Sequence, residues 1–162
     1  AEKMRIHSGG LVSFNNGIEL GSGLDATAAN TLDDYEEGDW DVTFKGAGGS
    51  AGSQAYNGDQ SSYIKIGRMV YARFYRSMSN KGSWSGNVQL WGLPFTVALR
   101  APVFFAQYPS TVMDAAYRSG FAVAGAAYMN VWAGSRMDAF AQYSEIDSGY
   151  YFQGEVIYET DS

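Results

Sequence analysis

The amino-acid sequence lacks cysteine, and its 162 residues include a single histidine, His7. Without cysteine, the chain forms no disulfide, has no thiolate nucleophile and binds no zinc through sulfur. One histidine also excludes most Ser-His-Asp triads and most metal sites built from several imidazoles. We therefore expect no cofactor and no bound metal, and we interpret His7 as a packing or surface residue.

Basic residues are also scarce: 11 Lys and Arg stand against 17 Asp and Glu, which gives a net charge of −6. Affinity for nucleic acid comes first from clustered basic side chains, so this balance argues against a nucleic-acid partner. Residues 1–38 carry two basic and seven acidic groups, whereas residues 39–162 carry nine and ten. The larger segment is therefore nearly neutral, which favours recognition by stacking and hydrogen bonding over electrostatic capture.

Long apolar runs are missing as well. Two long uncharged stretches, residues 82–99 and 119–135, are interrupted by polar residues, Gly or Pro. Neither exceeds the ~18 residues at which a membrane-spanning helix becomes a candidate. We interpret both as buried or interface strands and expect a soluble chain. The start at Ala1 suggests a fragment or a processed product, and no secretory signal follows Lys3 and Arg5.

What the sequence does contain is 20 glycines and 25 aromatic side chains. Runs rich in aromatic and β-branched residues and punctuated by Gly are typical of strands. Three stretches alternate as a strand with one buried face does. Their predicted inward residues are Trp40, Val42 and Phe44; Val70, Ala72 and Phe74; and Tyr150, Phe152, Val156 and Tyr158. Shorter strands are predicted at residues 62–66, 87–91, 103–108, 121–126, 128–132 and 137–143.

The opposite face of the second stretch carries Met69, Tyr71, Arg73 and Tyr75. Aromatic rings mixed with arginine suit either a solvated surface or a subunit interface in which guanidinium groups stack on rings. The many short, regularly spaced strands predict an all-β chain folded as a jelly-roll-like antiparallel β-sandwich. The length allows one sizeable core, which we place in residues 39–162.

Residues 1–38 follow a different pattern. Short strand-like pieces at residues 4–8, 11–14 and 17–20 are separated by turns, and a meander of this size buries no core of its own. We expect identical pieces of other chains to stabilise it by packing around an axis. Residues 21–29 are interpreted as a linker. Thr31 is the expected N-cap of a helical turn that ends at Gly38.

Acidic residues are dense here, with six carboxylates in residues 33–41. A calcium loop is one interpretation, but the spacing departs from the D-x-D-x-D-G pattern, and solvated acids of a capped turn explain it as well. The Gly-rich residues 46–53 lack the Lys-Ser/Thr end of a phosphate loop and are predicted to form a hairpin tip. Candidates for a pair of glycosidase carboxylates, which no spacing marks, are Asp114, Asp138, Glu145 and Asp147.

Aromatic residues in or beside the predicted loops are candidates for ligand contact. Tyr and Trp combine a flat apolar face with a polar tip, which suits stacking on sugar rings. Packing in a core or in a subunit interface is the alternative for each of them. The predicted ligand-binding residues are Tyr56, Trp84, Tyr108, Tyr128, Trp132 and Tyr143.

Several segments resemble tail-fibre and appendage proteins of bacteriophages, notably marine and cyanobacterial ones. Residues 29–40 (ANTLDDYEEGDW) resemble the segment that opens a terminal domain in that family. Residues 63–70 (YIKIGRMV) and 83–95 (SWSGNVQLWGLPF) resemble later motifs, and residues 2–12 (EKMRIHSGGLV) are similar to pieces of fibre shafts. Asp39 departs from the family, which often has Thr there. Beyond about residue 95 the likeness rests on the β pattern and on Phe152-Gln153-Gly154.

The resemblance implies a homotrimeric fibre of the virion, outside the cell, with residues 1–38 as neck and linker and residues 39–162 as a β-sandwich knob. The implied function is attachment to the host cell surface, where we expect a carbohydrate receptor, with other virion proteins on the N-terminal side. It implies no enzyme and transfers no binding residue. The alternatives are a structural capping or assembly domain and, less favoured, a glycan-degrading tailspike domain.

Overall fold

The computed structural model describes residues 2–15, 18–19, 31–32, 34–47, 52–108, 119–132, 139–146 and 148–161. Within these ranges the regular structure is β-strand, apart from one short 3-10 helix, η2 (Tyr143–Glu145). No helix there is long and apolar enough to span a membrane. The expectation of an all-β chain is confirmed.

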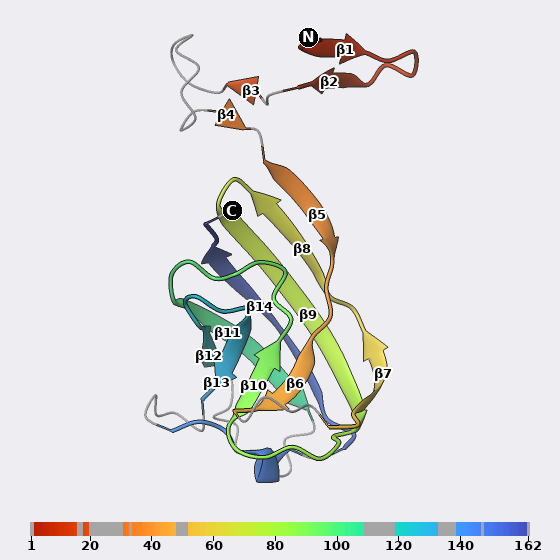
Figure 1. Cartoon of the computed structure of the whole chain (residues 1–162). Helices are drawn as coiled ribbons and strands as arrows, with labels where there is room; N and C mark the ends of the chain where they lie inside the picture. The colour runs from red at the N-terminus through yellow and green to blue at the C-terminus, as the bar shows by residue number, and fades with distance from the viewer. Residues whose placement is uncertain are drawn as a thin grey trace.

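Most strands belong to one antiparallel sheet of ten strands (Figure 1). Its order is β5 (Tyr35–Asp39), β8 (Ser62–Ile66), β9 (Met69–Asn80), β14 (Tyr151–Glu159), β11 (Ala101–Tyr108), β12 (Ser119–Ala122), β13 (Tyr128–Val131), β10 (Val88–Trp91) and β6 (Thr43–Gly46), with β7 (Ala55–Asp59) pairing with β9. The C-terminal strand β14 therefore lies inside the sheet, between β9 and β11.

The sheet curls back on itself, because its two end strands are neighbours in the chain. β5 and β6 stand at opposite ends of the strand order, yet residues 40–42 alone connect them. Trp40 lies at this connection, and its indole Nε1 donates to the carbonyl oxygen of Arg73 at 3.1 Å. Across the interior, the rings of Phe44 on β6 and Phe152 on β14 pack with centroids 4.8 Å apart. The curled sheet thus has a sandwich-like interior with one core; jelly-roll connectivity stays a prediction.

The core is built from the predicted inward residues. All of those named for the three alternating stretches are buried, with Val42, Phe44, Val70 and Phe152 completely enclosed. On β9 the intervening residues from Met69 to Tyr75 are exposed or half-buried. The predicted alternation is confirmed, and each enclosed large apolar side chain contributes about 1.5–3 kcal/mol of transfer free energy.

Two glycines permit the close approach of backbone segments, one beside the 40–42 connection and one at the end of β6. Gly92, with φ of 104°, follows β10, and a Cβ at this position would lie 2.0 Å from the carbonyl oxygen of Asp41. A Cβ on Gly46 would lie 1.8 Å from the carbonyl oxygen of Ser85. Any side chain at either position would force the backbones apart.

The N-terminal segment forms separate short pieces of sheet. β1 (Met4–Ile6) pairs with β2 (Val12–Phe14), and β3 (Ile18–Glu19) pairs with β4 (Thr31–Leu32). Figure 1 shows both pairs beyond the start of β5, outside the curled sheet. The predicted strand-like pieces are confirmed, with slightly shorter bounds, while the predicted linker at residues 21–29 lies outside the described residues.

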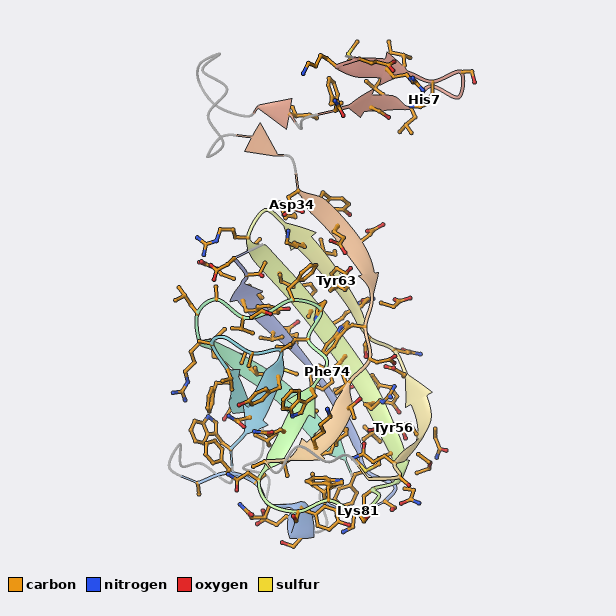
Figure 2. The ribbon with its side chains drawn as sticks, in the orientation of Figure 1. His7, Asp34, Tyr56, Tyr63, Phe74 and Lys81 are labelled. Carbon is orange, nitrogen blue, oxygen red and sulfur yellow. The ribbon has the colours of Figure 1, made fainter. Side chains whose placement is uncertain are left out.

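The hairpin of β1 and β2 has one apolar face. Met4 pairs with Phe14 and Ile6 with Val12, so the four side chains point to the same side. Their exposed fractions are 52%, 48%, 67% and 43%, in that order. On the hairpin lies also the exposed His7, whose Nε2 is 3.0 Å from the Ser13 hydroxyl (Figure 2). The hairpin therefore presents a small apolar surface with no cover from its own chain among the described residues.

The helical turn expected from Thr31 to Gly38 is wrong. Residues 31–32 form β4, and β5 pairs along its whole length with β8. The acids find partners across the strands: Asp34 forms an ion pair with the buried Lys65, and Glu36 accepts a hydrogen bond from the Tyr63 hydroxyl. These long-range contacts replace the local capping that the sequence predicts. The expected boundary between residues 38 and 39 falls inside β5, and the division into domains stays a prediction.

Two further expectations for local structure are wrong. The hairpin predicted around residues 46–53 is wrong, because the flanking strands do not pair with each other: β6 pairs with β10, and β7 pairs with β9. The strand predicted at residues 137–143 is absent from the described part of that range. Phe140 and Gln142 form isolated bridges to Trp132 and Asn87 there, and η2 begins at Tyr143.

Candidate functional site

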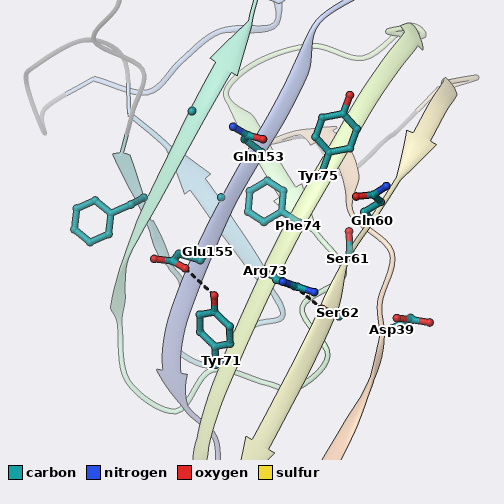
Figure 3. Close-up of a pocket in the computed structure, with 13 residues that line it drawn as sticks. Asp39, Gln60, Ser61, Ser62, Tyr71, Arg73, Phe74, Tyr75, Gln153 and Glu155 are labelled. Atoms are coloured by element: carbon teal, nitrogen blue, oxygen red, sulfur yellow. Dashed lines mark hydrogen bonds between the residues drawn. The ribbon is translucent and has the colours of Figure 1, made fainter.

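An open groove of about 870 Å³ lies on the outer face of the curled sheet. It crosses β8, β9, β14 and β11, with Asp39 of β5 at one side (Figure 3). The face is the one predicted from the alternation of β9, and Tyr71, Arg73 and Tyr75 line the groove. The predicted outward face of β9 therefore forms part of the groove.

The strand register explains which other residues join them. Arg73 stands opposite Ser62 on β8 and opposite Glu155 on β14, and Glu155 stands opposite Phe104 on β11. Directly paired residues of antiparallel strands point to the same side, so these side chains form one row across the groove. The next row holds Tyr75 and Gln153. Phe104 is 64% exposed and marks the side of the groove away from Asp39.

Hydrogen bonds hold the polar groups of the groove in place. The Tyr71 hydroxyl donates to Oε2 of Glu155 at 2.8 Å, and Arg73 Nε donates to the Ser62 hydroxyl at 2.9 Å (Figure 3). The hydrogen bond to Glu155, with burial and the Glu155 charge, raises the pKa of Tyr71 above its ordinary value. Tyr71 is therefore a neutral donor at physiological pH. The groove presents fixed donors, fixed acceptors and aromatic rings together.

Beyond the groove, toward the start of β5, the same face turns apolar. Ile64, Ile66, Met69 and Ile157 are 41% to 58% exposed there. The register places Ile66 opposite Met69, and Ile64 and Ile157 on either side of Tyr71. This part of the face offers contact area without hydrogen-bonding groups.

A smaller hollow of about 320 Å³ adjoins the groove at Asp39, Gln60 and Ser61. Asp41 and Asp59 also line it, and a hydrogen bond between these two carboxyl groups raises the pKa of Asp41. Arg76 is nine-tenths buried nearby and forms ion pairs with both acids. The described residues hold no cluster of three or more His, Cys, Asp or Glu side chains arranged for a metal ion.

Three of the predicted ligand-binding aromatic residues, Tyr56, Trp84 and Tyr143, pack against their own chain. Tyr56 is half-buried, with the Arg76 guanidinium 3.8 Å from its ring centroid. Burial raises the pKa of its hydroxyl, against the opposing effect of a backbone hydrogen bond at Phe44. Trp84 is buried, and its ring meets that of Tyr143 edge-on at 4.5 Å. None of the three lines the groove.

Two others, Tyr128 and Trp132, lie on the outer face of the sheet at β10 and β13, outside the groove. Tyr128 stacks on Trp91 with ring centroids 4.4 Å apart. Trp132 is buried and stacks on Phe140 at 4.9 Å. The side chain of Tyr108 lies outside the described residues. Ligand binding by the six predicted aromatics stays a prediction, since the structure describes packing for five of them.

The candidate glycosidase acids are not brought together in the described residues. Asp114, Asp138 and Asp147 lie outside them. Glu145 accepts a hydrogen bond from the backbone N–H of Gln142 at 2.6 Å, which closes the first turn of η2. Sequence reasoning missed Phe104, Gln153 and Glu155 as groove residues. Only the pairing of β14 with both β9 and β11 reveals them.

Comparison of the chain with protein-family models, with curated proteins and with solved structures finds no match in any of the three. The case for a function therefore depends on the chain's own geometry and on the resemblance of its segments.

Proposed function

We propose that this chain is a non-enzymatic attachment domain of a bacteriophage tail fibre or virion appendage, and that it binds a glycan of the host cell surface. The observation that carries the proposal is the open groove of about 870 Å³, lined by aromatic rings and planar polar groups. Ligand sites commonly combine apolar area with a few convergent polar groups in a space of this size. The sequence resemblance supports the virion setting.

The chemistry of the groove suits a sugar. Tyr71, Tyr75 and Phe104 supply flat apolar surfaces, against which the apolar face of a sugar ring packs. Arg73 and Glu155 supply a fixed donor and a fixed acceptor for hydroxyl groups. Gln153 offers both kinds of group in one amide. An open groove also accepts a chain of sugars that extends beyond it at both ends.

A glycan array and whole-cell binding measurements test this proposal. The intact chain should bind a subset of glycans saturably, and Arg73→Gln or Glu155→Gln should weaken that binding about tenfold or more. Arg68→Gln is the matched control, because Arg68 is an exposed arginine that pairs with Glu159 and Asp161 outside the groove. Absence of saturable binding to any glycan or to host cells would favour the structural alternative instead.

We further propose that the chain works as a homotrimer, with residues 1–38 as its neck and the curled sheet as a jelly-roll-type knob. Support comes from the hairpin of β1 and β2, whose apolar side chains Met4, Ile6, Val12 and Phe14 are about half exposed. An isolated two-stranded hairpin is marginal in water, so a partner surface is needed to stabilise it. Three linked binding sites would raise apparent affinity by about 10² to 10⁴.

Sedimentation analysis tests the trimer. The intact chain should sediment as a trimer at micromolar concentration, and Ile6→Asp, which places a charge on the apolar face, should shift it toward the monomer. Arg5→Asp is the control, because Arg5 lies in the register on the other face, opposite Ser13. A stable monomer for the unmodified chain would contradict the trimer without affecting the test of the groove.

A further inference from the structure

We propose a second binding surface, for an anionic saccharide such as a uronic-acid oligomer. It lies on the outer face of β6, β10, β13 and β12 and is separate from the groove. Lys45, Gln89, Asn130 and Phe121 form its central row, and Arg100 lies over the ring of Phe121.

The register places these groups in one line. Lys45 pairs with Gln89, Gln89 with Asn130, and Asn130 with Phe121, across four neighbouring strands. Their sequence neighbours Phe44, Leu90, Met129 and Ala122 are completely buried, so the row itself faces outward. Three strand spacings put Lys45 and Phe121 roughly 14 Å apart. The row is long enough to contact more than one sugar ring.

Both ends of the row carry a cation that no described carboxylate neutralises. Lys45 Nζ lies 4.5 Å from the ring centroid of Trp91, and the Arg100 guanidinium lies 3.5 Å from that of Phe121. Ion pairs in the described residues involve other basic side chains, Arg5, Lys65, Arg68 and Arg76. In a chain of net charge −6, two cations held on aromatic rings form a local positive surface.

The middle of the row is a fixed pair of amides. Trp91 Nε1 donates to Gln89 Oε1 at 3.1 Å, and Gln89 Nε2 donates to Asn130 Oδ1 at 3.0 Å. Gln89 is only 8% exposed, so this relay is anchored in a partly dry surface. The relay ends at the half-buried Asn130, whose amide nitrogen is a further donor. Such a donor suits a hydroxyl or carboxylate oxygen.

Charge and ring content together select the ligand class. Carboxylates are complementary to Lys45 and Arg100, and the half-buried rings of Trp91 and Tyr128 supply apolar area beside the row. A nucleic acid also combines rings and negative charge, but it needs more cationic contacts than this row offers, and the acidic chain repels it as a whole. An acidic saccharide needs only the two cations that are present.

Titration calorimetry of the intact chain with oligogalacturonate, and with a neutral gluco-oligosaccharide of equal length, tests the surface. Oligogalacturonate should bind, more weakly at higher salt because salt screens the charges of Lys45 and Arg100. Lys45→Gln and Arg100→Gln should each weaken binding about threefold and together about tenfold. Arg68→Gln is the control outside the surface, and thermal melting checks that each variant is folded.

Each result decides the proposal. Loss in the double variant, with a preference for the acidic over the neutral oligomer, supports it. No binding at about 10 mM oligogalacturonate, equal binding of the neutral oligomer, or an unaffected double variant would overturn it. Binding of oligothymidylate at least as tight as that of oligogalacturonate would assign the surface to nucleic acid and also overturn it. Arg73→Gln reads out the groove, so failure here and failure of the glycan proposal are distinguishable.

Discussion

The hairpin of β1 and β2 and the curled sheet are both made of short antiparallel strands, but they differ in where their apolar side chains lie. In the curled sheet Val42, Phe44 and Val70 are completely buried, whereas Ile6 in the hairpin is 67% exposed. The sheet gains its stability within one chain, because its ends are joined and its interior is closed. The hairpin has no comparable burial among the described residues, and a two-stranded hairpin alone is marginal in water. Both regions form strands, but only the curled sheet buries the apolar side chains that stabilise it.

The largest effect on this comparison is expected from Phe44→Ala. Phe44 is completely buried against Phe152, so the change should lower the free energy of unfolding by about 3–5 kcal/mol. Urea unfolding followed by tryptophan fluorescence measures this, since the four tryptophans, at positions 40, 84, 91 and 132, all belong to the sheet region. A loss below about 1 kcal/mol would show that the interior is not closed around Phe44.

A somewhat smaller effect is expected from Gly92→Ala. The new Cβ would meet the Asp41 carbonyl oxygen at 2.0 Å, at a φ of 104°, so we expect a loss of about 2–4 kcal/mol in the same unfolding assay. Gly67→Ala is the matched control, because Gly67 has φ of 55° with open space around it and should cost only about 1 kcal/mol. Equal losses in both variants would mean that the close approach to residues 40–42 is unimportant.

Tyr158→Phe tests a polar contact inside the curled sheet. The Tyr158 hydroxyl lies 3.2 Å from both the backbone nitrogen and the carbonyl oxygen of Phe95, and its loss should cost about 1 kcal/mol at pH 7. Burial raises the pKa of Tyr158 to about 12. The proton is therefore held more tightly in the folded chain, so its stabilising contribution is complete below pH 10 and is lost as the pH rises toward 12.

Measuring the free energy of unfolding between pH 9 and 12 tests whether the contribution of Tyr158 falls as the pH rises. The difference between the original chain and Tyr158→Phe should shrink as the pH rises. A difference that stays constant with pH would contradict the role of the buried hydroxyl.

The smallest effect is expected from Phe14→Ser in the hairpin. Phe14 is 48% exposed and contributes nothing to the interior of the curled sheet, so tryptophan-detected unfolding at low protein concentration should change by less than about 0.5 kcal/mol. The same variant should weaken self-association in sedimentation experiments. A large change in sheet stability would show that the two regions are energetically coupled.

The sequence predicts strands well where one face is buried. Alternation in residues 40–44, 69–78 and 150–158 identifies Phe44, Phe74 and Phe152 as core residues, and the structure buries them. It fails where a partner distant in the chain decides the outcome. Residues 31–38 are predicted to form a capped turn, whereas Lys65 and Tyr63 of β8 bind the acids Asp34 and Glu36. The preference of a short segment for a turn is weaker than the stabilisation that such long-range contacts give to a strand.

The groove shows the same limit. Tyr71, Arg73 and Tyr75 follow from alternation on one strand, but Glu155 and Phe104 join them only because β14 lies between β9 and β11. The sequence of β14 itself does not indicate which strands it pairs with, since any antiparallel strand could lie between β9 and β11. The rings of Trp84 and Tyr143, which we predicted to contact a ligand, instead pack on one another. Packing of two large rings within the chain removes their apolar surface from water.

The position of β14 also constrains how the chain folds. β14 pairs with β9 on one side and with β11 on the other. Each of those two long strands therefore lacks one of its neighbours until residues 151–159 have been synthesised. Contacts across such sequence separations form slowly. A chain shortened before β14 would hold two unpaired strand edges in the middle of its sheet, which is a template for aggregation. The middle of the sheet can therefore close only after residues 151–159 have been synthesised.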